Sequence, residues 1–473
     1  MGKRLIKIFL TCLFAVWIAF FFVDVKVDGW KKVADRFLAA GQAETAEEMY
    51  QKIKRIQPWR TLDWRTLALM YTRQGKPEKV ISILEPWIKN DRLDVADVVM
   101  LSTAYEITGD TEKSRELLET ASRKVIDGND YQIIQLQRAK LHRAKHEYDQ
   151  ALACLRQLQE KGLNTPESEI DTILLTVIVS PERLSMMDIE DSSLPDWVKE
   201  WSRSISDVVD ESDPSQRWFL IGRRFGSIGE WDLAEYAFMN AVDLSPEMAD
   251  SWALLAEARQ QQGKSGKDAI TRALELAPDS PAVRLTAALY YRRQQDTKKA
   301  IELLEENIRD NPNEVIWYLE KGNALAEGGR LDDAVMAYQR AVDLYPEDPA
   351  GYRAAARFSI QYAYRLEEVG LEAANSVIAL DRDAPDGYDL KGLILSALGK
   401  PEEASAAYQI AIEKDEKYAP VWLHIGQMAL EQADFSSARD ALEKSIKLGG
   451  RSYEAQLAGR LLKEYFGEVI PLP

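Results

Sequence analysis

Two histidines stand four residues apart, which is the spacing in this sequence that best suits metal binding. His142 and His146 would lie on one face of a helix, where two imidazoles can hold zinc if a third ligand is supplied. Both fall within a repeating helical pattern, His142 at a packing position and His146 at a turn between helices. His424 is the third histidine of the chain and stands alone. We therefore expect no metal site.

Other residue combinations that carry out chemistry are missing from the sequence. It contains no phosphate-binding loop, no G-x-S-x-G turn, no H-E-x-x-H helix and no paired C-x-x-C. The two cysteines cannot build a disulfide framework, because Cys12 lies in a hydrophobic N-terminal stretch and leaves Cys154 alone. We predict a protein that is not an enzyme and that uses no cofactor.

The charge of the chain limits the partners it can bind. Its net charge is −17 and no long basic stretch interrupts the acidic character, so nucleic acid is an unfavourable ligand. The hydrophobic fraction of 46% is large enough for a buried core. A folded, protein-binding body is the class of molecule that remains.

An uncharged apolar stretch runs from residue 8 to residue 23, directly after three basic residues within 3–7. Sixteen helical residues span about 24 Å, and apolar neighbours extend this toward the ~30 Å hydrocarbon core. The alternative is a cleaved secretory signal, but phenylalanines at 20–22 stand where small residues are needed. We expect a single-pass transmembrane helix with a cytoplasmic N-terminus and the body on the outer side, because positive charge precedes the stretch.

Large side chains recur along the rest of the chain at nearly constant intervals. A first run is spaced 34 residues apart at Trp30, Trp64 and Val98. A second run, spaced 32 to 36 residues apart, comprises Trp218, Trp252, Arg284, Tyr318, Tyr352, Tyr388 and Trp422. Four residues after each large residue stands a small one, at Ala34, Ala68, Ser102, Gly222, Ala256, Ala288, Gly322, Ala356, Gly392 and Gly426. A period near 34 indicates repeated helix–turn–helix units.

Helix packing explains two further columns, that is, two more sets of residues that recur at the repeat interval. Mostly small residues recur at the start of each second helix, at Ala46, Val80, Ser114, Ala234, Ala300, Ala334, Ala404 and Ala438. Antiparallel helices approach to about 8 Å only where such residues face each other. Larger residues four positions on would fill the space between successive pairs: Tyr50, Leu84, Leu118, Phe238, Leu304, Tyr338, Tyr408 and Leu442.

Glycine and proline mark the ends of the predicted helices. Glycines at the end of the first helix favour a left-handed cap, at Gly41, Gly75, Gly109, Gly229, Gly263, Gly329 and Gly399. Prolines after the second helix block its continuation, at Pro58, Pro246, Pro278, Pro312 and Pro346. The pattern is therefore one of antiparallel helix pairs joined by short turns.

The segment from Trp218 to Pro246 resembles the tetratricopeptide repeat at nearly every defining position, and the resemblance covers about eleven units. It implies an all-α fold, an α-solenoid that winds as a right-handed superhelix of antiparallel helix pairs. The unit at 130–158 is weaker, with His142 where the family usually has an aromatic residue. The unit at 351–382 carries about two extra residues and has Gly370 where alanine is usual.

The repeats define the expected organisation of the chain. We predict an N-terminal tip and anchor at 1–28, a first block of about four repeats at 29–162 and a second block of about seven at 215–450. Residues 163–214 break the period and are interpreted as a degenerate helix pair with a long loop, whose second helix Ser193 or Asp196 could cap. A hinge between two solenoids is the alternative. Residues 451–473 hold a capping helix and a tail.

The resemblance implies that the first helices line an inner groove where peptides or helices bind. The residues expected to point into it are Arg65, Arg73, Lys140, Arg143, Arg223, Arg292, Asn323, Arg353, Arg357 and Gln427. Many are basic in an acidic protein, which suggests an acidic ligand because guanidinium groups pair with carboxylates. The lysine–asparagine clamp by which some family members hold chaperone C-termini is not matched, since its asparagine positions hold Asp35, Leu69, Thr103 or Arg223.

These features together suggest a membrane-anchored scaffold that binds protein partners in its groove. A factor for assembling envelope glycan or polysaccharide is the alternative, because tetratricopeptide arrays also accompany such systems. Fold does not decide between them.

Overall fold

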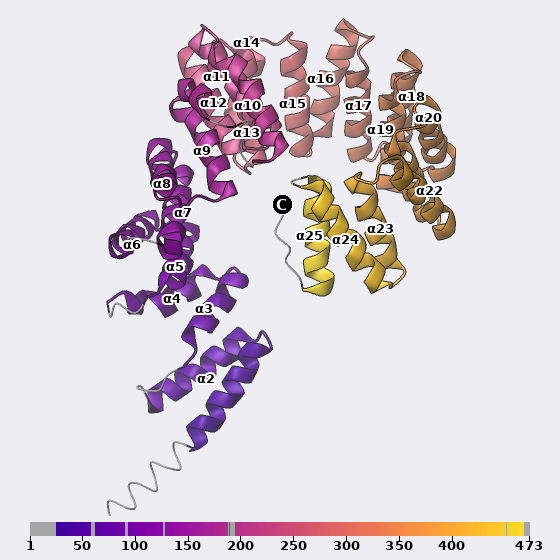
Figure 1. Cartoon of the computed structure of the whole chain (residues 1–473). Coiled ribbons are helices and arrows are strands. Elements are labelled where there is room, and N and C mark those ends of the chain that lie inside the picture. The colour runs from indigo at the N-terminus through magenta and orange to yellow at the C-terminus, as the bar shows by residue number, and fades with distance from the viewer. Residues whose placement is uncertain are drawn as a thin grey trace, which may run out of the picture. The chain divides into compact units, whose positions relative to one another are not determined.

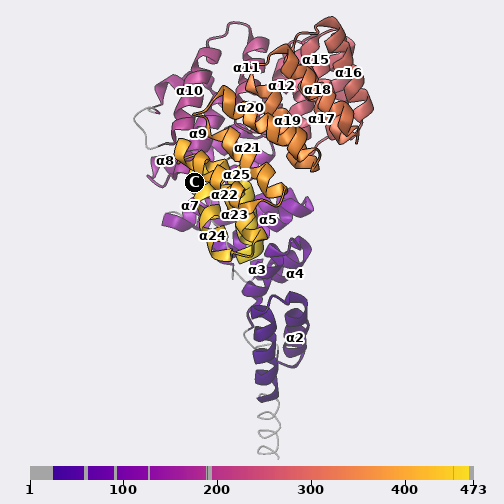
Figure 2. The same cartoon turned by 90° about the vertical axis from the view of Figure 1, so that its right-hand side faces the viewer.

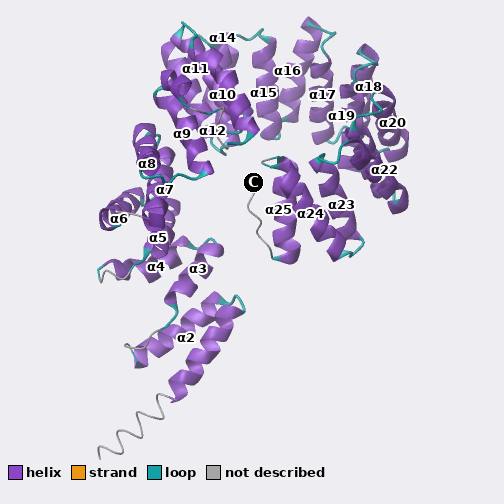
Figure 3. Ribbon diagram, in the orientation of Figure 1, coloured by secondary structure: helices purple, strands orange, loops and turns teal. Residues whose placement is uncertain are grey.

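The computed structural model describes residues 25–57, 62–89, 93–125, 128–187, 189, 194–450 and 452–467. Within these ranges every regular element is helical and no strand is present (Figure 3). The predicted all-α solenoid is confirmed. The chain divides into two units, Met1–Asp210 and Glu211–Pro473.

Unit 1 consists of successive antiparallel helix pairs (Figures 1 and 2). After a helix over residues 25–39 come α2 (Ala43–Ile56), α3 (Trp64–Arg73), α4 (Pro77–Ile88), α5 (Val95–Thr108), α6 (Thr111–Lys124), α7 (Gly128–Ala144) and α8 (Tyr148–Glu160). The interrupted region follows with α9 (Pro166–Val179), the 3₁₀ helix η1 (Pro181–Met186) and α10 (Asp196–Val209).

Unit 2 continues the same arrangement from α11 to α25. Its first helices are α11 (Pro214–Ser227), α13 (Ala249–Gln261), α15 (Pro281–Arg293), α17 (Val315–Glu327), α19 (Pro349–Tyr362), α21 (Pro385–Ala397) and α23 (Ala419–Glu431). Its second helices are α12 (Trp231–Leu244), α14 (Lys267–Leu276), α16 (Thr297–Asp310), α18 (Leu331–Leu344), α20 (Glu372–Leu380), α22 (Pro401–Lys414) and α24 (Phe435–Gly449). A last helix, α25 (Tyr453–Phe466), closes the series.

The turn inside each pair requires a left-handed residue. All seven glycines expected at this position have φ between +67° and +86°. Where glycine is missing, His146, Gln295 and Ala433 take the same conformation, with φ of +58°, +62° and +57°. The backbone geometry of the turn is therefore kept even when the residue type is unfavourable.

The small and large columns meet inside each pair. A Cβ atom added to Gly222 would lie 2.6 Å from the Phe238 ring, and one added to Gly322 would lie 2.6 Å from the Tyr338 ring. A Cβ added to Gly426 would lie 2.8 Å from Leu442. The small residue of the first helix thus makes room for the large residue of the second, as the sequence columns suggested.

Several large residues at the starts of first helices make the same kind of hydrogen bond. Trp252 Nε1 donates to the Pro246 carbonyl at 2.9 Å, and Tyr318 Oη donates to the Pro312 carbonyl at 3.0 Å. Arg284 stands in the same column and donates from Nε to the Pro278 carbonyl at 2.7 Å. Each acceptor lies six residues before its donor. These three positions therefore share a side chain that can donate to this carbonyl. Arginine can replace an aromatic residue here because it also donates.

The unit with extra residues absorbs them in an irregular turn. After α19, Ala363 and Arg365 are left-handed, with φ of +46° each, and a π-helical turn η2 (Leu366–Leu371) leads into α20. A Cβ on Gly370 would lie 2.9 Å from Ser359 Cβ, so the glycine permits the close approach of η2 to α19.

In the interrupted region, α9 is the apolar run seen in the sequence and is buried along most of its length. The start of α10 differs from the prediction. The helix begins at Asp196 after Pro195, and no side chain caps it. Ser193 lies outside the described residues.

The predicted single-pass membrane localisation needs correction. No helix in the ranges described above is both long and apolar enough to cross a bilayer. The segment at 8–23, on which the prediction depended, lies outside the described residues.

The end of unit 2 is covered by α25. Ala458 and Leu462 of α25 are fully buried against Leu423, Leu442 and Ile446 of the last helix pair. Ser452 caps the helix by accepting a hydrogen bond from the Ala455 amide at 3.1 Å. This helix shields the apolar face of α23 and α24 from water.

Candidate functional site

The first helices of unit 2 form one continuous layer. Each packs against the next first helix as well as against its own second helix, as α13 does with α15 and α19 does with α21. Side chains on their free faces are therefore presented together. This is the layer to which the resemblance assigns the groove.

In unit 1, two of the predicted groove arginines are held in ion pairs between neighbouring first helices. Arg65 Nε donates to Oδ1 of Asp97 at 2.7 Å, and Asp97 is fully buried. Arg143 lies 3.2 Å from Asp171. Arg73 and Lys140 are exposed instead.

In unit 2, Arg292 and Arg353 are paired in the same way. Arg292 donates from Nε and Nη2, along one edge of its guanidinium, to the two carboxylate oxygens of Glu327 at 3.0 and 2.6 Å, and its Nη1 contacts Glu320. Burial lowers the pKa of Arg292, but the bond to Glu327 and the charge of Glu320 outweigh it and raise the pKa overall. Arg353 forms an ion pair with Asp386. The carboxylate partners, which the sequence did not indicate, stand 28 to 35 residues further on.

The remaining predicted residues of unit 2 differ in their surroundings. Asn323 accepts a hydrogen bond from Tyr338 Oη at 2.7 Å and donates from Nδ2 to Glu320, a partner of Arg292, at 3.3 Å. Arg223 and Arg357 are exposed, and neither has a carboxylate partner among the described residues. Gln427 is half-buried and lines a hollow described next.

Two hollows open on the first-helix layer. The first, about 800 Å³, is lined by Leu289, Arg292, Glu327 and Tyr362 among others. Arg292 and Glu327 pair with each other, and Arg293, which also lines this hollow, pairs with Glu257. The second, which we call the C-terminal hollow, is about 420 Å³. It is lined by Ile360, Leu393, Ser396, Ala397, Tyr408, His424, Gln427, Met428, Leu430, Glu431, Leu461 and Tyr465.

A hydrogen-bonded pair of side chains supports the C-terminal hollow. His424 Nδ1 lies 2.7 Å from Asp389 Oδ1, and Asp389 is 3% exposed. Burial, together with the negative charge of Asp389, raises the pKa of Tyr408 and of Tyr418. Sequence reasoning dismissed His424 as isolated. Its partner stands 35 residues earlier, at a neighbouring position of the preceding repeat, which is the signal that could have revealed the pair.

The two spaced histidines do not converge on a metal site. His142 Nδ1 lies 2.7 Å from Glu147, whose pKa is lowered mainly by this bond. His146 Nδ1 lies 2.8 Å from the Tyr148 hydroxyl. Across the described ranges, no group of three histidine, cysteine, aspartate or glutamate side chains could hold a metal ion.

The arrangement defines a helical repeat protein, and comparison with known proteins identifies the repeat. The family model described as "Tetratricopeptide repeat" matches residues 285–349 and 390–453. The chain therefore contains tetratricopeptide repeats in unit 2.

Curated relatives match parts of the chain. The cytochrome c-type biogenesis protein CycH of Rhizobium meliloti is 33% identical over 165 residues, covering 33% of this chain and 42% of that protein. The peroxisomal targeting signal receptor of Saccharomyces cerevisiae is 31% identical over 80 residues, covering 17% of this chain and 13% of the receptor. The chain thus spans less than half the length of these relatives.

Solved structures of similar helical arrays include yeast Tom70, at 15% identity and a TM-score of 0.44 over 93% of this chain and 95% of that one. A tetratricopeptide repeat protein from Parabacteroides merdae is 16% identical, with a TM-score of 0.41 over 55% of this chain and 98% of that one.

Proposed function

We propose that the protein is a non-enzymatic scaffold that binds a segment of a partner protein on the first-helix layer of unit 2. The observation that carries the proposal is the C-terminal hollow. It opens where three first helices and α25 meet, and its lining combines apolar and polar side chains.

The chemistry of the hollow suits an amphipathic peptide. Leu393, Leu430 and Leu461 are only partly buried, so they offer apolar surface that a partner side chain can cover. Gln427 and Glu431 stand beside them and can bind polar groups of the partner. Amphipathic helices dock in grooves with this combination of an apolar centre and a polar edge.

The charges on this layer further limit which partners can bind. Arg292 and Arg353 are neutralised by carboxylates of the same chain, so they offer little to an outside anion. Arg223 and Arg357 remain exposed on the same layer. Acidic groups of the partner would pair with these two arginines, because guanidinium groups bind carboxylates with charge-assisted hydrogen bonds.

The relatives support a role in handling other proteins. The names of two of them describe a receptor for a targeting signal and an Hsp70-Hsp90 organizing protein of Arabidopsis thaliana. The matched regions cover only 13% and 34% of these two relatives. For this chain they favour protein binding as a class rather than any particular partner.

Site-specific photo-crosslinking tests the proposal. A photoreactive residue is placed at Gln427 in the C-terminal hollow, and in a second protein at Met336, which is 70% exposed on α18. Both proteins are expressed in the native cells, and crosslinked products are identified by mass spectrometry. We expect polypeptide products from position 427 that position 336 does not give.

A substitution checks that the products come from the hollow. Leu393→Asp should abolish crosslinking at 427, whereas Met336→Asp should leave it unchanged, and both proteins should keep their helical circular dichroism. Identical products from both positions, or products that survive Leu393→Asp, would contradict binding in the hollow. Products containing glycan and no polypeptide would favour the glycan-assembly alternative instead.

A further inference from the structure

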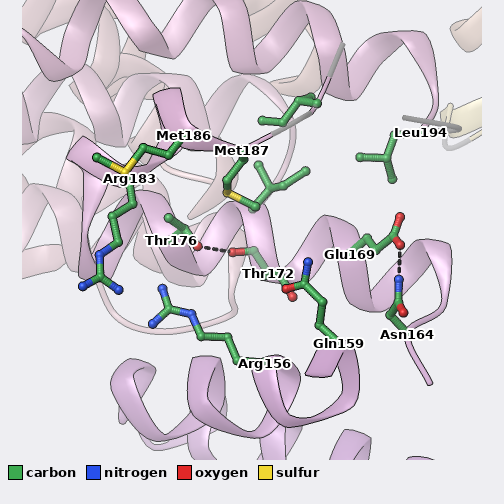
Figure 4. A pocket seen from close by; sticks show the side chains of 12 residues that line it. Arg156, Gln159, Asn164, Glu169, Thr172, Thr176, Arg183, Met186, Met187 and Leu194 are labelled. Carbon is green, nitrogen blue, oxygen red and sulfur yellow. Dashed lines mark hydrogen bonds between the residues drawn. The ribbon is translucent and has the colours of Figure 1, made fainter. Parts of the chain in front are cut away.

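A cavity of about 520 Å³ lies in unit 1 where the repeat pattern is interrupted (Figure 4). It is bounded by α8, one face of α9 from Glu169 to Thr176, η1, and the described residues Met187, Ile189 and Leu194. Its inner wall is buried, with Ile173 2% and Thr176 1% exposed, whereas Met186 at its rim is 81% exposed. The volume falls within the range of about 300–1,000 Å³ that is usual for small-molecule sites.

The inner wall of this cavity is apolar. Ile173, Ile189 and Leu194 contribute aliphatic side chains, and Met187 adds a flexible thioether. Thr172 and Thr176 also line it, but each hydroxyl donates to a backbone carbonyl four residues earlier, at 2.7 Å. With the proton of each hydroxyl already donated, these threonines can offer the cavity only acceptor lone pairs, so this wall does not bind an anion and favours an apolar chain.

One end of the cavity carries positive charge. Arg156 from α8 and Arg183 from η1 extend toward the same end in the view of Figure 4. Neither has an ion-pair partner among the described residues, although the chain carries a net charge of −17. Arg143 on α7, by contrast, is paired with Asp171 of α9. The carboxylate of Glu169 stands at the opposite end and accepts a hydrogen bond from Asn164.

We infer that this cavity binds a small amphiphilic anion, an unbranched apolar chain that ends in a carboxylate or a phosphate. The apolar wall covers the chain, and Arg156 with Arg183 binds the charged group. The site lies in unit 1 and is separate from the proposed peptide site in unit 2. The scaffold would therefore carry a ligand of its own beside its protein partner.

Calorimetric titration of the full chain with linear carboxylates tests the inference. We expect one dodecanoate per chain, bound below its critical micelle concentration. Affinity should rise about fourfold per added methylene from octanoate to dodecanoate, because each buried methylene removes apolar area from water. Dodecanol, which has no charge, should bind at least about tenfold more weakly than dodecanoate. Dodecyl phosphate in place of dodecanoate shows which anionic group the arginines prefer.

Three variants assign the binding to this cavity. Arg156→Gln with Arg183→Gln should weaken dodecanoate binding at least about tenfold. The matched control, Arg309→Gln with Arg340→Gln, removes the same charge from exposed positions on α16 and α18 and should leave binding unchanged. Met187→Trp should fill part of the cavity. In this variant the affinity should stop rising at a shorter carboxylate than it does in the unchanged protein.

Several results would overturn the inference. They are the absence of saturable binding for both dodecanoate and dodecyl phosphate, equal affinity for dodecanol, and an equal loss of affinity in the control pair. If the Arg156 and Arg183 pair unfolds the protein, Met187→Trp still decides the matter. An unchanged dependence on chain length in that variant would place any binding elsewhere.

Discussion

At three of the turns inside helix pairs, a residue other than glycine takes the left-handed position where glycine usually stands, and Ala433 is the simplest of these. Its φ is +57° and its side chain is exposed, so its Cβ contributes strain and little packing. A left-handed residue with a Cβ costs about 1–2 kcal/mol, while glycine costs about 0.5–1 kcal/mol in lost chain entropy. Ala433→Gly should therefore stabilise the protein by about 0.5–1 kcal/mol, measured as a higher urea midpoint.

The matched control for Ala433→Gly is the reverse change in an equivalent turn. Gly399 has φ of +71° and nothing lies within 4 Å of an added Cβ, so Gly399→Ala tests strain alone. We expect it to lower the urea midpoint. A shift of both variants in the same direction would show that turn strain does not govern these positions.

The inner-face arginines show how far residue roles follow from sequence. The repeat register located Arg292 and Arg353 on the first helices, and they do lie there. Their carboxylates, Glu327 and Asp386, sit on the next first helix. Both carboxylates are visible in the sequence, but the repeat period does not predict that they pair with these arginines. Pairing depends on the offset between neighbouring repeats and on side-chain rotamers. The expected positive groove is consequently much less charged than the residue types suggested.

At the scale of elements, the contact between Gly222 of α11 and Phe238 of α12 can be tested directly. A Cβ on Gly222 would lie 2.6 Å from the ring, and Phe238 is 2% exposed, so the ring has little space to move into. Gly222→Ala should destabilise the pair by about 1–3 kcal/mol despite the better helix propensity of alanine. Urea denaturation measures the change.

A double-mutant cycle isolates this contact. Phe238→Leu by itself should destabilise the protein. The double variant with Gly222→Ala should lose less unfolding free energy than the two single variants added together, because leucine relieves the clash. Gly29→Ala serves as control, since nothing lies within 4 Å of its added Cβ, and it should be neutral or stabilising. If the two effects simply add, the small residues of the first helices are not required to make room for the large residues of the second helices.

Helix pairs were predictable where the columns were regular, and less so where residues were inserted. The sequence showed that the unit at 351–382 is longer than its neighbours. It could not show that the extra length forms the π-helical turn η2, because a loop or a bulged helix would give the same spacing. The start of α10 was misjudged for a similar reason. A polar residue near a helix start suggests a cap, but the helix begins after Pro195 without one.

At the scale of the whole molecule, the array behaves as a series of neighbouring contacts. Each pair packs on the pairs beside it, so the stability of one repeat depends mainly on its immediate neighbours. The ends of such a series are its weak points. In unit 2 the last helix pair depends on α25, whose Leu462 is fully buried against that pair.

Placing a charge under α25 tests this dependence. Leu462→Asp would bury an unpaired carboxylate against Leu423, Leu442 and Ile446, so α25 should detach. Amide exchange in α23 and α24 should then accelerate about a hundredfold, equivalent to about 3 kcal/mol of lost local stability. Hydrogen–deuterium exchange mass spectrometry should find α3 to α8 unchanged, and the neighbouring exposed change Lys463→Ala should have no effect. Faster exchange throughout both units would instead show that the chain unfolds as one cooperative body, and the view of the array as a series of local contacts would fail.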